Sequence, residues 1–101
     1  MDLKERDKIL AEVKRTLLNI LQNKEARVYL FGSWARGDEK RTSDIDIAID
    51  YTASDAAEVF TRLRYELEES TIPYNVDILE ILSADENIVR KIKSEGILWK
   101  D

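Results

Sequence analysis

The sequence predicts one α/β domain of the α+β type, in which a small mixed sheet has helices packed mainly on one face. Segments with helical spacing of apolar residues alternate with short runs rich in β-branched residues, and most connections between them are short. The chain has 101 residues, 44% of them hydrophobic, which suffices for one modest core. Because no repeat or linker divides it, we expect a single domain over residues 1–101.

The first helix is expected over residues 3–21. Its apolar residues recur at helical spacing, and Asp2 with Glu5 forms the pattern of a capping box. The segment "ARVYLF" at 26–31 follows, with β-branched and aromatic residues that predict a mostly buried strand ending at Gly32. We expect Tyr29 and Phe31 to belong to the core.

Strict alternation predicts a second strand in "DIDIAID", residues 44–50. Isoleucines occupy one face of this strand, and three aspartates with Ala48 occupy the other. The isoleucine face should pack against the helices, and the acidic face should then look into a cleft.

The remaining elements follow the same logic. Ser54 is expected to cap a helix that reaches about Glu69, and Pro73 prevents its continuation. "YNVDILEI" alternates as a third strand, "SADE" at 83–86 has the pattern of a capping box before a further helix, and Gly96 ends that helix. "ILW" at 97–99 is expected to form a last short strand.

Composition excludes several kinds of chemistry. The chain has no cysteine and no histidine, which removes disulfides, thiolate nucleophiles, zinc-thiolate sites and the usual general base. Carboxylate and hydroxyl oxygens suit hard cations such as magnesium or manganese. A net charge of -5 argues against binding of duplex nucleic acid. No apolar run approaches the roughly 20 residues that span a bilayer, and no signal peptide is recognisable, so we expect a cytoplasmic protein with no membrane partner.

Asp44 and Asp46 carry the strongest signal for chemistry. Side chains two residues apart on a strand point the same way, with Cα atoms about 6.7 Å apart, so the two carboxylates can converge on cations. Two magnesium ions about 3.5 to 4 Å apart can clamp the attacking and leaving oxygens of a phosphoryl transfer. Asp77, on the third strand, is the natural third carboxylate if the two strands are neighbours.

Gly32 and Ser33 supply the other half of such a site. Glycine lets the backbone approach a phosphate closely, and the serine adds a hydroxyl and an amide donor. If Ser33 begins a short helix through Arg36, the amides at its start favour an anion, and the Arg36 guanidinium can neutralise a phosphate oxygen.

Each of these residues also has a structural interpretation. Alternating Asp and Ile is typical of any half-buried strand with one wet face, and Gly32-Ser33 is typical of a turn. Arg36 could be a solvated loop charge, and Asp77 could simply face solvent. Trp34 could pack against the loop or form a platform for a nucleobase, and we favour packing. Only the combination of three strand-end features favours a functional site.

The stretch "GSWARGDEKRTSDID" resembles the signature of the DNA polymerase beta-like nucleotidyltransferase superfamily. That signature is glycine-serine, ten residues, Asp-x-Asp and a later strand carboxylate, and Gly32-Ser33, residues 34–43, Asp44, Asp46 and Asp77 in "NVDILE" fill these places. The "GS-aromatic-ARG" form and the length are most similar to the minimal nucleotidyltransferases (MNT) of prokaryotes. The resemblance covers nearly the whole chain and implies the nucleotidyltransferase fold.

The resemblance also implies an activity: transfer of a nucleoside monophosphate, most simply AMP from ATP, to an acceptor hydroxyl, with two Mg²⁺ ions or Mn²⁺ in their place. Asp44 and Asp46 would hold both metal ions, and Asp77 would complete the catalytic metal site and help activate the hydroxyl. The nucleotide would be held by Gly32, Ser33, Arg36 and Ser43. Many relatives have a basic residue after Gly-Ser, and Trp34 departs from that pattern.

MNT proteins are typically partnered with a small helical HEPN protein in toxin-antitoxin pairs, in which the MNT member is the antitoxin and can adenylylate a tyrosine of the toxin. The resemblance therefore implies a HEPN-type toxin as partner and acceptor. Two alternatives stay open. One is an antitoxin that occludes its toxin without catalysis, and the other is transfer to a small molecule such as an aminoglycoside, which would require a partner or a homodimer to build the acceptor pocket.

Overall fold

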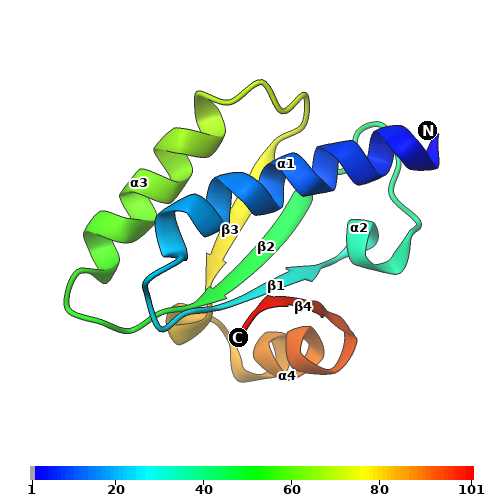
Figure 1. The fold of residues 1–101 in the computed structure, drawn as a ribbon. Coiled ribbons are helices and arrows are strands. Elements are labelled where there is room, and N and C mark those ends of the chain that lie inside the picture. Colours follow the sequence, from blue (N-terminus) through cyan, green and yellow to red (C-terminus); the bar gives the residue numbers. More distant parts are fainter. Residues whose placement is uncertain (1) are drawn as a thin grey trace.

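A computed structural model describes residues 2–101, which form a four-stranded mixed sheet with helices on both faces (Figure 1). The strand order is β3-β2-β1-β4. The elements in chain order are α1 (Leu3–Leu21), β1 (Arg27–Phe31), α2 (Ser33–Arg36), β2 (Ile45–Asp50), α3 (Ala56–Glu68), β3 (Val76–Glu80), the 3₁₀ turn η1 (Ile81–Ser83), α4 (Glu86–Glu95) and β4 (Ile97–Lys100). The expected order of helices and strands is therefore confirmed.

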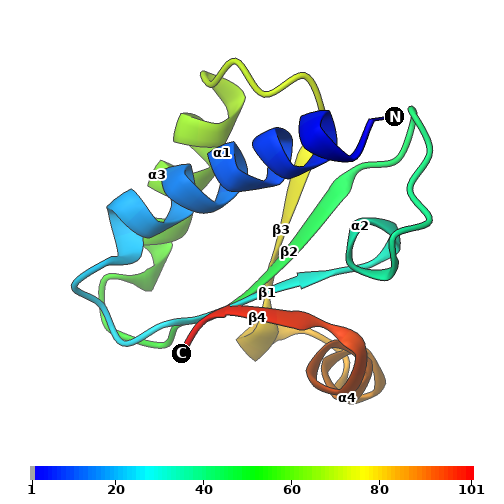
Figure 2. The same cartoon turned by 45° about the vertical axis from the view of Figure 1, so that its right-hand side comes forward.

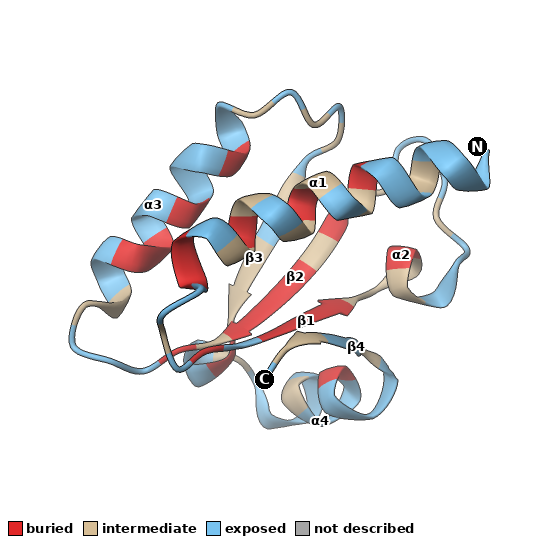
Figure 3. Ribbon diagram, viewed as in Figure 1, coloured by how far each residue is buried: buried red, intermediate tan, exposed pale blue. Residues whose placement is uncertain are grey.

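The central strand β2 runs antiparallel to β1 and parallel to β3, and β1 also pairs antiparallel with β4. A parallel pair needs a crossover connection, which α3 supplies between β2 and β3. Strand β2 is buried along most of its length, whereas β3 at the edge is only half-buried (Figure 3). Both β3 and β4 are edge strands of this sheet.

The main core lies between one face of the sheet and the helices α1 and α3, which cover that face together (Figures 1 and 2). The alternation of β2 explains this arrangement, because its isoleucines point to the helices. The fully buried side chains of this core include Val13, Leu17, Leu21, Val28, Leu30, Ile45, Ile47, Ile49 and Leu63.

A smaller core lies on the opposite face of the sheet. Tyr29 of β1 and Ala48 of β2 pack there against Ile81 of η1 and Ile92 of α4, and the half-buried Phe31 lies beside them. Helix α4 thus covers part of the face that carries the aspartates, whereas α1 and α3 share the other face, as expected for helices packed mainly on one face. The acidic side chains lie toward the carboxyl end of β1, beyond this cover.

Two of the expected helix caps were wrong. Helix α3 has Asp55, not Ser54, at its N-cap position, and α4 is capped by Asp85, whose carboxylate accepts from the amide of Asn87 at 2.8 Å. The Asp55 carboxylate instead accepts hydrogen bonds from the hydroxyl of Tyr51 and from Lys24 Nζ at 3.0 Å. These hydrogen bonds hold the pKa of Asp55 below its ordinary value.

Within residues 2–101, no helix is both long and apolar enough to cross a membrane.

Candidate active site

The glycine turn after β1 requires glycine for two separate reasons. Gly32 has φ 74° and ψ -156°, a combination that side chains with a Cβ atom rarely adopt. A Cβ atom at Gly32 would also overlap the Asp46 carboxylate. The Asp46 carboxylate therefore lies directly against the backbone of the turn, so the structure brings together two of the residues expected at the site.

Helix α2 begins at Ser33 immediately after this turn, as expected. Ala35 and Arg36 both donate their amides to the Gly32 carbonyl, at 3.1 and 3.2 Å. Gly37 ends the helix in the left-handed conformation, with φ 78°. The partly exposed Ser33 is thus fixed at the first helical position, next to the residue that touches Asp46.

Strand register places the aspartates in one row across the sheet. Asp46 of β2 lies opposite Phe31 of β1 on one side and opposite Asp77 of β3 on the other. Residues paired across neighbouring strands share a face and have Cα atoms about 5 Å apart, so the two carboxylates emerge side by side. The condition stated for Asp77, that its strand be the neighbour of β2, is met. Asp44 is exposed and lies just before the first residue of β2.

Charge couples these residues. Burial raises the pKa of Asp46 above its ordinary value, the negative charges of Asp77 and Asp44 raise it further, and the positive charge of Arg36 opposes the shift. Asp77, Asp44 and Arg36 are therefore close enough to Asp46 for their charges to act on its carboxylate. A bound cation would relieve the repulsion among the carboxylates.

The two remaining residues expected to bind nucleotide have partners of their own. Arg36 is exposed and forms an ion pair with Asp38, Nε to Oδ2, at 3.2 Å. The Ser43 hydroxyl accepts from the Lys40 amide at 2.9 Å and the Ser43 carbonyl accepts from Trp34 Nε1 at 3.3 Å, so Ser43 shapes the loop before β2. A phosphate contact stays a prediction for both residues.

Trp34 is a core residue, and the nucleobase platform considered for it is wrong. Its side chain has 0% exposure and packs edge-to-face against Tyr74, with ring centroids 5.0 Å apart. Arg6 of α1 stacks on the Trp34 ring, donates to its carbonyl, and donates from Nε to both carboxylate oxygens of Glu39 at 3.1 Å. This contact ties α2 and the following loop to α1.

Sequence reasoning missed this anchor, and it also missed Asn75. The Asn75 amide donates to Asp77 Oδ1 at 3.0 Å and so holds one carboxylate oxygen in place. The spacing was available in the sequence, because residues two apart on a strand share a face. Arg6 and Glu39 lie 33 positions apart, and no local pattern connects them.

The donor set fits a hard divalent cation, because Asp44, Asp46 and Asp77 supply carboxylate oxygens near the same end of β2 and β3. The raised pKa of Asp46 shows that its negative charge is unfavourable there without a cation. Within residues 2–101, however, no three acidic side chains are already close enough together to hold a metal ion. The carboxylates are brought into one neighbourhood by strand register, and their side chains are not closed into a cage.

Comparison with known proteins decides the family. The family model described as "Polymerase beta, Nucleotidyltransferase" matches residues 15–100. The chain belongs to this nucleotidyltransferase family. The expected enzyme class and family are therefore confirmed.

Individual relatives of this nucleotidyltransferase are consistent with that assignment. "Putative protein adenylyltransferase MJ0435" of Methanocaldococcus jannaschii is 36% identical over 85% of this chain and 92% of its own length. "Protein adenylyltransferase MntA" of Shewanella oneidensis is 34% identical over 71% of this chain and 52% of its own length. A solved minimal nucleotidyltransferase is 26% identical, with a TM-score of 0.74 over 96% of this chain and 95% of that one. The chain also shares its fold with a toxin-antitoxin structure with AMP-PNP. The two are 24% identical, with a TM-score of 0.68 over 86% of this chain and 72% of that one.

Two hollows of the nucleotidyltransferase adjoin the aspartates and the glycine turn. A groove of about 520 Å³ runs between α3 and β3 and contains Asp77 and Asn75. An apolar pocket of about 210 Å³ lies between the glycine turn and α4 and contains Gly32 and Arg36. Neither hollow includes Asp44 or Asp46. The expected cleft is thus two hollows that flank the row of aspartates.

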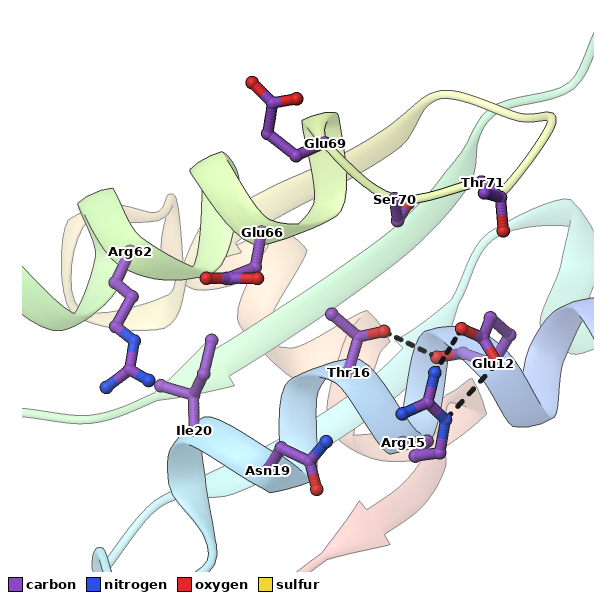
Figure 4. Close-up of a pocket in the computed structure, with 10 residues that line it drawn as sticks. All are labelled: Glu12, Arg15, Thr16, Asn19, Ile20, Arg62, Glu66, Glu69, Ser70 and Thr71. Atoms are coloured by element: carbon purple, nitrogen blue, oxygen red, sulfur yellow. Dashed lines mark hydrogen bonds and ion pairs between the residues drawn. The ribbon is translucent and has the colours of Figure 1, made fainter.

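A further polar groove of about 440 Å³ separates α1 from α3 on the sheet face away from the aspartates (Figure 4). Glu12 and Arg15 of α1 pair with each other on one side, and Arg62 and Glu66 lie on α3 on the other. None of the residues expected at the active site lines this groove.

Proposed function

We propose that the chain is a Mg²⁺-dependent protein adenylyltransferase, which moves AMP from ATP to a hydroxyl of a HEPN-type helical toxin and thereby acts as its antitoxin. The proposal takes residues 1–101 as one minimal nucleotidyltransferase domain. Relatives named as protein adenylyltransferases support the reaction, and the fold shared with toxin-antitoxin structures supports the partner. The observation that carries the proposal is the row that places Asp46 beside Asp77 and against Gly32.

In this proposal the residues of the chain bind and orient the reactants. Gly32 lets the triphosphate approach the backbone, Ser33 donates its amide and hydroxyl to it, and Arg36 neutralises charge. Asp44, Asp46 and Asp77 would hold two Mg²⁺ ions, which supply positive charge to the phosphates when bound. The acceptor oxygen forms a bond to the α-phosphorus, the bond from that phosphorus to the bridging oxygen breaks, pyrophosphate leaves, and Asp77 takes the hydroxyl proton.

Calorimetric titration of ATP with and without Mg²⁺, on the wild type and on Asp46→Asn, tests the nucleotide site. We expect binding that requires both the metal ion and Asp46. Labelled ATP then tests transfer to the HEPN-type partner, and we expect Asp46→Asn to abolish it while the fold is kept. Full transfer by this variant would contradict the proposal.

The absence of a preassembled metal cage within residues 2–101 favours one competing function, an antitoxin that neutralises by occlusion alone. The triple variant Asp44→Asn, Asp46→Asn, Asp77→Asn separates the two functions. Toxin neutralisation that survives in the triple variant would establish occlusion, and its loss supports catalysis. A panel of aminoglycosides, assayed with the same labelled ATP in the absence of the partner, tests the small-molecule alternative.

A further inference from the structure

The free edge of β3 is exposed beside the row of aspartates. Strand order leaves β3 with β2 as its one strand neighbour within residues 2–101. The amide of Ile45 donates to the Asn75 carbonyl at 2.9 Å, and β3 continues from there in parallel register. Alternate residues of a parallel strand direct their N–H and C=O groups to the same neighbour. Asp77 therefore bonds inward to β2, and Val76 and Ile78 direct their backbone groups outward.

We infer that this outer edge docks the acceptor segment of the partner protein, which adds to the sheet as an extended strand with its hydroxyl side chain beside Asp77. The inference rests on the proposed function and deepens it by naming where the acceptor binds. Addition of a strand to a free edge is a common way to bind an extended peptide, because main-chain hydrogen bonds give affinity without demanding a particular sequence.

Register decides which residue of the segment is the acceptor. Phe31, Asp46 and Asp77 already share one row and one face of the sheet. A residue paired with Asp77 on an added strand would occupy the next place in that row, about 5 Å from Asp77 and on the same face. Because Asp77 bonds inward, this pairing is of the non-hydrogen-bonded kind, in which side chains approach most closely when strands run antiparallel.

The groove between α3 and β3 gives the segment space and a preferred charge. Its volume is about 520 Å³ and it runs along β3 to Asp77 itself. Its charged side chains are Arg64, Glu68 and Asp77, and the Arg64 guanidinium already pairs with Glu80 at 3.2 Å. Glu68, Asp77 and Glu80 thus place three carboxylates along this edge and Arg64 places one guanidinium there, so we expect basic residues on either side of the acceptor hydroxyl.

Arg64 lies over the outer edge of β3. Its Nη2 atom lies 3.4 Å from the Ile78 carbonyl, one of the outward-facing acceptors. Charged side chains over an edge strand discourage pairing with unrelated chains. An incoming segment would replace this long contact with a shorter main-chain hydrogen bond.

The chain has no cysteine, so one introduced thiol can be labelled uniquely. Glu68→Cys carries a bulky maleimide into the proposed groove, and Glu66→Cys on the same helix carries it into the groove between α1 and α3. Transfer of AMP to the HEPN-type partner is measured before and after labelling. We expect labelling at position 68 to slow transfer at least about tenfold with ATP binding kept, and labelling at position 66 to change neither.

Unchanged transfer after labelling at position 68 would overturn the inference, and so would loss of ATP binding there, because the groove would then hold the nucleotide.

Amide hydrogen exchange gives a readout that does not depend on catalysis. Binding of the partner should slow exchange at Val76 and Ile78 by about tenfold or more, and unprotected amides at both positions would refute strand addition. If the wild type binds no ATP, the proposed function is contradicted but the docking inference is not. Hydrogen exchange then still decides whether this edge docks the partner.

Discussion

At the scale of single residues, Gly32 and Gly37 offer a matched comparison, because both have positive φ and they flank the same short helix. A Cβ atom at Gly32 would overlap the Asp46 carboxylate, whereas a Cβ at Gly37 meets nothing within 4 Å. We expect Gly37→Ala to cost about 1 kcal/mol of unfolding free energy and Gly32→Ala to cost about 2–4 kcal/mol and to weaken ATP binding. Urea denaturation and calorimetry measure both effects. Equal losses from the two variants would show that the close approach to Asp46 has no energetic consequence.

Asp46 carries the second prediction at this scale. Its pKa is raised by burial and by the charges of Asp77 and Asp44, so at neutral pH its ionised form is less favourable in the folded than in the unfolded chain. This penalty is absent below the ordinary aspartate pKa of 3.8 and develops as the pH rises through the raised value. Without metal, Asp46→Asn should therefore raise the Tm at pH 7 and do so progressively less as the pH falls through the raised pKa.

Thermal unfolding in the presence of a chelator, at several pH values, checks this expectation. In a second series without chelator, added Mg²⁺ should raise the Tm of the wild type at pH 7 and should leave the Tm of Asp46→Asn nearly unchanged. The Leu82→Ser variant, which replaces an exposed side chain of η1, is a control without charge. A lower Tm for Asp46→Asn at pH 7 would mean that the carboxylate makes a favourable contact stronger than the repulsion.

At the scale of elements, the four-residue helix α2 is anchored through Trp34, whose ring and carbonyl are contacted by Arg6. Arg6 reaches this helix from α1 and also binds Glu39, with side-chain exposures of 18% and 9% for the pair. We expect Arg6→Ala to cost about 1–3 kcal/mol of unfolding free energy and to lower ATP affinity, because the turn that contacts Asp46 begins α2.

Arg15→Ala is the matched control for that prediction. It breaks an exposed pair with Glu12 on the same helix, and such pairs contribute about 0–1 kcal/mol. Chemical denaturation ranks the two variants. A loss at Arg15 as large as that at Arg6 would indicate that α1 itself, and not the anchor of α2, sets the stability.

Local sequence signals predicted most elements and most of the candidate site. Strict alternation placed Asp44 and Asp46, and the glycine-serine break placed the start of α2, because each depends on neighbouring residues alone. The caps of α3 and α4 were less predictable, since candidate acceptors stand close together in "SD" and "SADE" and local sequence does not choose between them. The position of α4 over the acidic face, and the Arg6 contact with Trp34, depend on packing between distant segments.

At the scale of the whole molecule, the net charge of -5 and the acidic row on one face favour a partner surface of opposite charge. Salt shortens the Debye length from about 30 Å at 0.01 M to about 8 Å at 0.15 M, so attraction between the two surfaces should weaken over this range. We therefore expect the association rate with the proposed HEPN-type partner to fall by about tenfold or more across that range, while the dissociation rate changes less. Stopped-flow mixing at several salt concentrations measures both rates. An association rate independent of salt would mean that the partner recognises this chain through apolar contacts, such as those available around Ile88 and Leu98, and not through the acidic edge of β3.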